Sequence, residues 1–226
     1  MTPYQRLARR AAENGAAPFV TWYGTDGSRI DLSATTFANA VAKLAGLLDS
    51  ELEVTPGGSL LLDIPSHWQL SVWLAAGDAL GMDIQSTEIG GTEADIVATI
   101  NPECELPGEK VLVPISPMGL PGPQAPAGFV DQAREAMGQP DVFPDLGEAG
   151  RLRYQQHWLA DANLVSTCQE LAKTAGLATG GRLVISGESA DLMLAAYALP
   201  LVIDASVVIL EDPETDVSAE SVSARL

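Results

Sequence analysis

Positively charged residues, cysteines and histidines are scarce in this chain of 226 residues. Twelve Lys or Arg face 30 Asp or Glu, which gives a formal net charge of -18 at pH 7. Such a chain repels a nucleic-acid backbone or an anionic bilayer at long range, so neither is expected as a partner. Two cysteines are too few for a disulfide framework, and the spacing of the cysteines and the two histidines does not fit a set of metal ligands. We therefore expect neither a disulfide framework nor a metal site.

A secretory signal and a membrane-spanning run are also missing from the sequence. The first residues lack the basic, then apolar, then small-residue order of a signal peptide. The apolar stretch 190–210 is interrupted by Asp191, Pro200 and Asp204, so it is too short to span a bilayer. Together with the low cysteine content, these absences predict a cytoplasmic protein. Hydrophobic residues still make up 46% of the chain, which is typical of a folded domain.

Apolar periodicity predicts alternating helices and strands along most of the chain. Thr2 and Pro3 are typical of a helix start, and Asp26-Gly27 is typical of a hairpin turn. Residues 60–64 form an apolar run without alternation, as expected of a parallel strand that is covered on both faces. The other predicted strands are 19–23, 29–32, 82–86, 110–115, 183–185 and 207–210, and the predicted helices are 3–14, 34–48, 67–80, 129–137, 162–175 and 190–202.

This pattern predicts an α/β fold of two similar Rossmann-like subdomains with mainly parallel sheets. Residues 1–145 form the first predicted subdomain, and residues 146–211 form the second. Nine of the 15 prolines fall within residues 102–144, which we expect to run as an excursion over the surface of the first subdomain. Residues 212–226 are acidic and have little to bury, so they are predicted to form a flexible tail.

Two segments of the chain align without a gap at a shift of 123 residues. Gly57-Gly58 aligns with Gly180-Gly181, and residues 60–62 align with residues 183–185. Identities are few, so the alignment fits either a duplication or two units that share only a pattern of helix, turn and strand. In both cases the strand ends of the two units would form a cleft between them.

Motifs in both segments resemble the AMP-dependent synthetase and ligase superfamily, whose members form adenylates. The motifs are LSATTF (32–37), PGGSLLL (56–62), WLAAGDALGM (73–82), ANL (162–164), GLATGGRL (176–183), LPL (199–201) and VVIL (207–210). The chain is most similar to small actinobacterial proteins that are distant relatives of these enzymes. The resemblance covers residues 19–211 and implies the fold of an N-terminal region of an acyl-activating enzyme.

The chain departs from the superfamily at the phosphate loop. That loop is rich in Ser, Thr and Gly and ends in Pro-Lys, because backbone N–H groups and an ammonium group must offset phosphate charge. In its expected place before Ala162, residues 145–151 contain Asp145 and Glu148 but no Ser, Thr or Lys. The aromatic-x-Thr-Glu motif, the ribose-binding Asp and the C-terminal lid with its catalytic Lys are also absent. The departures therefore predict no catalytic residue and no cofactor.

The sequence alone is compatible with two functions. A non-catalytic relative of these enzymes would bind a small adenylate-like or acyl ligand, or a protein partner, in the cleft between the subdomains. The alternative is an active AMP-forming ligase that uses unconventional residues or a partner chain.

The residues that best fit a binding role lie at the ends of the two aligned strands. Ser66 and His67 follow the first strand, and Ser186 and Ser189 follow the second. Ligands of open α/β sheets bind at the carboxyl ends of strands, so these four residues are predicted to rim the pocket. Alternatively, Ser186 or Ser189 caps the next helix. The stretch between these two serines lacks the Gly-x-Ser-x-Gly pattern of a nucleophile elbow, which argues against a hydrolase.

Overall fold

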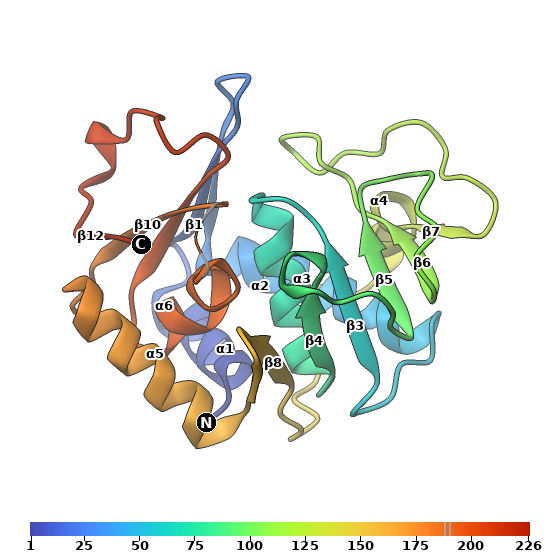
Figure 1. Ribbon diagram of the computed structural model, residues 1–226, viewed down its shortest axis with the longest axis horizontal. Coiled ribbons are helices and arrows are strands. Elements are labelled where there is room, and N and C mark those ends of the chain that lie inside the picture. The colour runs from blue at the N-terminus through green and yellow to red at the C-terminus, as the bar shows by residue number, and fades with distance from the viewer. Residues whose placement is uncertain (188, 190) are drawn as a thin grey trace.

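The computed structural model describes residues 1–187, 189 and 191–226. Two β-sheets lie on either side of helices α2 (Ala34–Ser50) and α3 (Trp68–Ala79) in the view of Figure 1. The largest hydrophobic core cluster includes residues from both sheets and from these helices. The predicted start of the last helix, at residue 190, lies outside the described residues.

The strands are parallel to their neighbours except in two hairpins. The five-stranded sheet has the order β12-β10-β11-β1-β2 and consists of β1 (Pro18–Tyr23), β2 (Arg29–Ser33), β10 (Arg182–Ser186), β11 (Ser206–Leu210) and β12 (Ala224–Arg225). The seven-stranded sheet has the order β7-β6-β5-β3-β4-β8-β9 and consists of β3 (Ser59–Asp63), β4 (Asp83–Ser86), β5 (Ile96–Thr99), β6 (Glu109–Leu112), β7 (Phe129–Asp131), β8 (Arg151–Tyr154) and β9 (His157–Leu159). Among the described pairs only β1–β2 and β8–β9 are antiparallel. The predicted α/β fold with mainly parallel sheets is therefore confirmed.

The helices that start at Pro3, Ala34 and Trp68 begin where the sequence provides capping groups. The Thr2 hydroxyl accepts a hydrogen bond from Gln5 N at 3.2 Å, and Gln5 Oε1 accepts one from Thr2 N at 3.0 Å. Besides α2 and α3, the helices are α1 (Pro3–Asn14), α4 (Gln132–Glu135), α5 (Asp161–Ala175), α6 (Leu199–Val202), the π-helix η3 (Leu194–Ala198) and the 3₁₀ turns η1 (Thr87–Ile89), η2 (Ala136–Gly138) and η4 (Ser218–Glu220). Within the described part of the chain, none of these helices has the length and apolar character needed to cross a bilayer.

The proline-rich region contains more strand than the sequence predicts. The sequence pattern does not predict β5, although all four of its residues are buried. β7 uses the first three residues of the predicted helix 129–137, because they pair with Lys110–Leu112 of β6. The helix α4 begins only after Asp131, whose carboxylate accepts a hydrogen bond from Arg134 N at 3.2 Å. Strand pairing has therefore overridden local helix propensity at this site.

The division between the sheets does not coincide with the predicted boundary at residue 145. β1 and β2 join the second predicted subdomain, because Val20 pairs with Val207 of β11. β8 and β9 join the first, because Asp83 of β4 pairs with Arg151 of β8. An apolar strand such as β11 needs hydrogen-bond partners along both edges, and β1 supplies the second edge. The two predicted subdomains thus exchange strands.

The C-terminal residues are part of the fold, contrary to the predicted flexible tail. β12 pairs with β10, and Val217 is buried. Glu220 is only 6% exposed, and its carboxylate accepts hydrogen bonds from Tyr23 OH at 2.6 Å, Arg29 Nε at 2.9 Å and Arg182 Nη2 at 2.5 Å. Burial raises the pKa of Glu220, but these hydrogen bonds outweigh burial and lower the pKa to about 2. One buried carboxylate therefore anchors the acidic segment.

The two segments that align at a shift of 123 residues match at the glycine pairs and at the strands that follow them. β3 and β10 begin and end at equivalent positions, and β4 and β11 begin at equivalent positions. Gly57 and Gly180 have φ of +82° and +78°, a conformation that favours glycine. Gly57 N donates to Gly81 O at 2.9 Å, and Gly180 N donates to Asp204 O at 3.0 Å. The glycine pairs thus build the same turn before each strand.

Candidate ligand-binding cleft

A cavity of about 510 Å³ lies at the carboxyl ends of strands from both sheets. It is formed by the segments that follow β4, β8 and β10. Its lining residues are Glu88, Ile89, Gln155, Gln156, Gly187, Ser189, Leu192 and Met193. Small-molecule sites occupy about 300–1,000 Å³ and, in parallel α/β sheets, lie at this edge of the strands. We call this cavity the cleft.

Ser189 lies on the wall of the cleft and also caps the polypeptide that follows it. Its hydroxyl accepts a hydrogen bond from Asp191 N at 3.2 Å. Asp191 in turn accepts a hydrogen bond from the Tyr154 hydroxyl at the end of β8. Ser186 is half-buried at the end of β10, where its carbonyl accepts a hydrogen bond from Ser189 N at 3.2 Å. The capping role considered for Ser189 on the sequence is therefore present in the structure.

Ser66 meets the loop after β10 from the opposite side. A Cβ atom added at Gly187 would lie 2.8 Å from Ser66 Oγ, so the two loops are in direct contact. Ser66 is buried, and its carbonyl accepts a hydrogen bond from Trp22 Nε1 at 2.9 Å. The structure thus brings together the ends of the two aligned strands, but Ser66 lies behind the wall of the cleft.

His67 is a buried capping residue at the start of α3. Its side chain is 3% exposed, and its ring centroid lies 4.4 Å from that of Trp22 and 5.5 Å from that of Trp68. Nδ1 accepts a hydrogen bond from Gln69 N at 3.2 Å, so the ring proton is assigned to Nε2. Nε2 is buried without a hydrogen-bond partner among the described residues. Burial lowers the pKa of His67 to about 4, which keeps the ring neutral at pH 7.

Sequence reasoning missed most of the residues that line the cleft. Gln155 and Gln156 form the turn of the β8–β9 hairpin, where Tyr154 pairs with His157. A Gln-Gln turn carries none of the Gly, Asn or Asp signals that mark hairpins, although Gln155 has a φ of +53°. Glu88 aligns with Glu211 in the repeat, but a lone carboxylate gave no chemical signal. The predicted site therefore overlaps the cleft at Ser189 alone.

The described residues that line the cleft offer no positive charge to a phosphate group. Among its described lining residues only Glu88 is ionisable, and partial burial raises the pKa of this carboxyl. The glycine-bearing stretch 145–151 lies at the other edge, because it leads into the amino end of β8. There Gly150 packs against Asp78 and the Met82 carbonyl. Nor do the described residues gather three His, Cys, Asp or Glu side chains as metal ligands.

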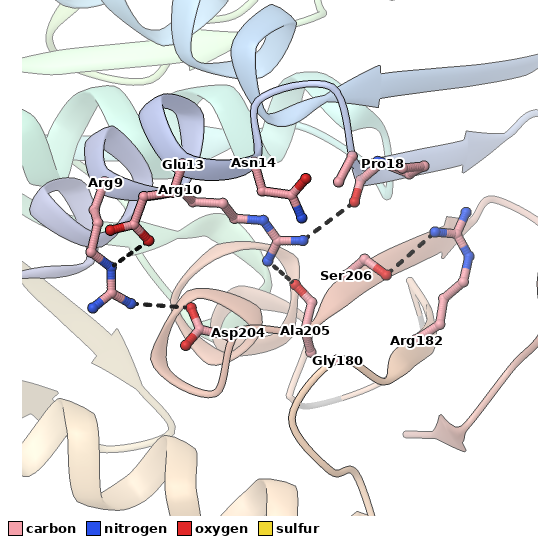
Figure 2. A pocket seen from close by; sticks show the side chains of 11 residues that line it. Arg9, Arg10, Glu13, Asn14, Pro18, Gly180, Arg182, Asp204, Ala205 and Ser206 are labelled. Atoms are coloured by element: carbon pink, nitrogen blue, oxygen red, sulfur yellow. Dashed lines mark hydrogen bonds and ion pairs between the residues drawn. The ribbon is translucent and has the colours of Figure 1, made fainter.

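Three arginines instead line a pocket of about 430 Å³ at the amino ends of β10 and β11 (Figure 2). We call it the arginine pocket, after Arg9, Arg10 and Arg182. Arg10 donates hydrogen bonds to the carbonyls of Ala205 and Pro18, the latter at 3.3 Å. Arg9 Nη2 lies 3.3 Å from Asp204 Oδ1 and Arg182 Nη1 lies 3.3 Å from Ser206 Oγ. The Arg9 and Arg10 guanidinium groups therefore tie α1 to the residues that precede β11, and the Arg182 guanidinium group ties β10 to β11.

Two acyl-CoA synthetases of known structure share this fold. The chain matches the Brucella canis acyl-CoA synthetase with a TM-score of 0.72 and 14% identity, over 95% of this chain and 44% of that one. It matches the acetoacetyl-CoA synthetase from Streptomyces lividans with a TM-score of 0.69 and 14% identity, over 95% of this chain and 39% of that one. The chain therefore has the fold of the N-terminal domain of an acyl-CoA synthetase.

One curated relative is similar in sequence. A TIGR03089 family protein of Mycobacterium tuberculosis (strain ATCC 25618 / H37Rv) is 31% identical over 125 residues, which are 51% of this chain and 51% of that protein. The alignment thus spans about half the length of the relative and less than half the length of each synthetase. No family model matches the chain.

Proposed function

We propose that the chain is a non-catalytic binding protein on an adenylate-forming fold, and that the cleft takes a small acyl or adenylate-like ligand without a pyrophosphate group. The observation that carries this proposal is the chemistry of the cleft wall. The polar side chains among its described lining residues are two amides, one hydroxyl and the carboxyl of Glu88. The Glu88 carboxylate would repel a triphosphate bound at this wall, and no cationic side chain among the described lining residues would offset the charge of the triphosphate.

The remaining wall supports a ligand with both apolar and neutral polar parts. Ile89, Leu192 and Met193 supply apolar surface. The amides of Gln155 and Gln156 can both donate and accept hydrogen bonds, as a nucleoside or an acyl carbonyl requires. Met193 directly precedes the π-helix η3, and such irregular turns often occur at functional sites.

Thermal unfolding with a matched ligand series tests the proposal. The series contains ATP with Mg²⁺, AMP, adenosine, acyl-CoA and an acyl sulfamoyl adenosine, which replaces the phosphate of an acyl adenylate. We expect stabilisation by adenosine or the acyl sulfamoyl adenosine and none by ATP. At a free ligand concentration of about 100 times the Kd, binding would raise the free energy of unfolding by roughly 2.7 kcal/mol. No stabilisation by either adenosine or the acyl sulfamoyl adenosine would overturn the proposal.

Glu88→Gln sharpens this test, with Glu93→Gln as its control. Both residues are exposed carboxylates near the end of β4, but only Glu88 lines the cleft. Removing the negative charge at Glu88 should improve AMP binding several-fold and leave adenosine binding unchanged, whereas E93Q should change neither. If the chain catalyses ATP–pyrophosphate exchange and substitution of Gln156 or Ser189 abolishes it, the chain is an enzyme and the proposal fails.

A further inference from the structure

A third cavity, of about 290 Å³, lies at the carboxyl ends of β5 and β6 beneath the proline-rich excursion. We call it the proline groove. Its apolar wall includes Ile100, Leu112 and Val113, which end or follow the two strands, and Pro114, Ile115 and Leu120 from the excursion. None of these residues lines the cleft. The groove is therefore a separate site, and its role does not depend on the proposed function.

The excursion that covers the groove is fixed at several points. Trp68 Nε1 donates a hydrogen bond to Pro117 O at 2.9 Å, and Arg134 Nη2 donates one to Gly122 O at 2.9 Å. Leu120 N donates to Ser116 Oγ at 2.8 Å. Prolines at six positions between 107 and 126 further limit its φ angles. The groove is thus held open by fixed backbone.

Apolar side chains remain exposed at the rim of the groove. Ile115 is 45% exposed and Leu120 is 58% exposed, although the chain is otherwise rich in surface carboxylates. An exposed apolar surface around a preformed hollow is typical of a ligand site. Met118, at 71% exposed, lies on the same excursion but outside the groove. It therefore provides a matched control for the rim residues.

The charge of the groove decides the class of ligand. Among the described lining residues, Asp131 alone is ionisable, and it already forms an ion pair with Arg134. The wall therefore supplies no cation for a carboxylate or phosphate, and the net charge of -18 repels anions. Gln124 and Ser116 add neutral hydrogen-bonding groups to the wall. A neutral polar end on the ligand would match these groups.

We propose that the proline groove binds a neutral, mainly apolar small molecule. Its volume is that of about ten molecules of liquid water, at roughly 30 Å³ each, so the ligand is smaller than most drug-sized molecules. Burial of Ile115 and Leu120 against the ligand supplies the affinity.

Titration of the full chain with the neutral fluorescent probe N-phenyl-1-naphthylamine tests this proposal. We expect saturable binding at one site, with displacement by 1-octanol at a concentration about tenfold lower than by octanoate at neutral pH. Leu120→Asp and Ile115→Asp should each weaken probe binding about tenfold or more, because a carboxylate would enter an apolar wall. Met118→Asp should leave the affinity within about twofold. Since all three residues are exposed, thermal unfolding should stay nearly unchanged.

Several outcomes would overturn the proposal. Equal losses for M118D and L120D would indicate nonspecific adsorption to the excursion. Displacement by octanoate as effective as by 1-octanol would contradict the charge argument. Dimerisation that L120D abolishes, measured by light scattering, would assign the groove to contact between two copies of the chain. Gln156→Arg in the cleft should leave probe binding unchanged, which separates failure of this site from failure of the proposed function.

Discussion

The amino and carboxyl edges of the parallel strands use polar side chains in different ways. At the amino edge, Arg10 and Arg182 donate to carbonyls and a buried carboxylate, and Asp78 accepts from Tyr4 N at 2.9 Å and Tyr197 OH at 3.0 Å. At the carboxyl edge, amides and a hydroxyl line an open cleft. Polar groups that are paired inside the fold stabilise it, whereas those on a cavity wall are available to a ligand. Substitutions of buried, paired groups at the amino edge should therefore change stability, and substitutions on the cleft wall should change binding.

The largest expected effect is that of Arg182→Met at the amino edge. Glu220 would lose one of its two arginine partners while staying buried. Breaking a buried ion pair in this way lowers the free energy of unfolding by about 3–5 kcal/mol. Urea denaturation measures the loss, and Arg225→Met, on the exposed face of β12, should change stability by less than about 0.5 kcal/mol. Similar losses in the free energy of unfolding for the two variants would contradict the anchoring role assigned to Glu220.

Asp78→Asn should flatten the dependence of stability on pH. Burial raises the pKa of Asp78 from 3.8 to about 6, although hydrogen bonds from Tyr4 N and Tyr197 oppose the shift. The folded chain thus holds this proton more tightly than the unfolded chain. The contribution to stability is therefore greatest below pH 3.8 and is lost, by about 3 kcal/mol, as pH rises to about 6. Urea denaturation at several pH values measures this slope, and parallel profiles for the two chains would contradict the assignment.

Glu220 should have the opposite effect at lower pH. Its folded pKa of about 2 lies below the ordinary value of 4.5. Its contribution to stability is thus fully present above pH 4.5 and is lost as pH falls toward about 2. Glu220→Gln should remove this acid sensitivity between pH 4.5 and 2, as measured by urea denaturation. An unchanged acid limb in E220Q would show that other carboxylates control it.

Ser189→Ala should change stability less than the substitutions of Arg182 and Asp78 do, but it should also weaken ligand binding. Losing the hydrogen bond from Asp191 N lowers the free energy of unfolding by about 1 kcal/mol. Because Ser189 lines the cleft, its removal should also weaken the acyl sulfamoyl adenosine several-fold in a calorimetric titration. Ser186→Ala, which alters a residue outside the cleft lining, is the control. A matching loss of affinity in S186A would place the binding surface elsewhere.

The smallest expected effect is that of Arg9→Met in the arginine pocket. Arg9 pairs with Asp204 and Glu13, and all three side chains are substantially exposed. Exposed ion pairs contribute little, so the change in stability should stay below about 0.5 kcal/mol in urea denaturation. Ligand affinity should not change, because Arg9 lies at the edge opposite the cleft. A loss of affinity in R9M would move the ligand to the arginine pocket.

Local signals made much of the fold predictable. The unbroken apolar runs of β3 and β10, each preceded by a Gly-Gly turn, indicate buried parallel strands from sequence alone. The pairing of strands was harder to predict, because a pair such as Val20 with Val207 joins residues that are far apart in the chain. The anchoring role of Glu220 could not be predicted either, because nothing in the sequence distinguishes it from the 29 other carboxylates. Only the fold brings Arg29 and Arg182 to it.

The candidate site was harder to predict than the fold. The rule that ligands lie at carboxyl strand ends located the correct edge and led to Ser189. The same rule selected His67, which follows the first aligned strand, yet in the structure His67 caps a helix and lies between two tryptophans. Gln155 and Gln156 enter the cleft only because β9 turns back along β8, a pairing for which the sequence carries no turn signal.

Methyl NMR of the chain most directly tests whether the cleft binds a ligand that lacks pyrophosphate. Ile89 and Met193 line the cleft and supply well-resolved probes on two of its walls. Titration with an acyl sulfamoyl adenosine should shift both resonances saturably, while ATP with Mg²⁺ at the same concentrations should shift neither. Saturable shifts of both methyl groups with ATP and Mg²⁺ would contradict this assignment.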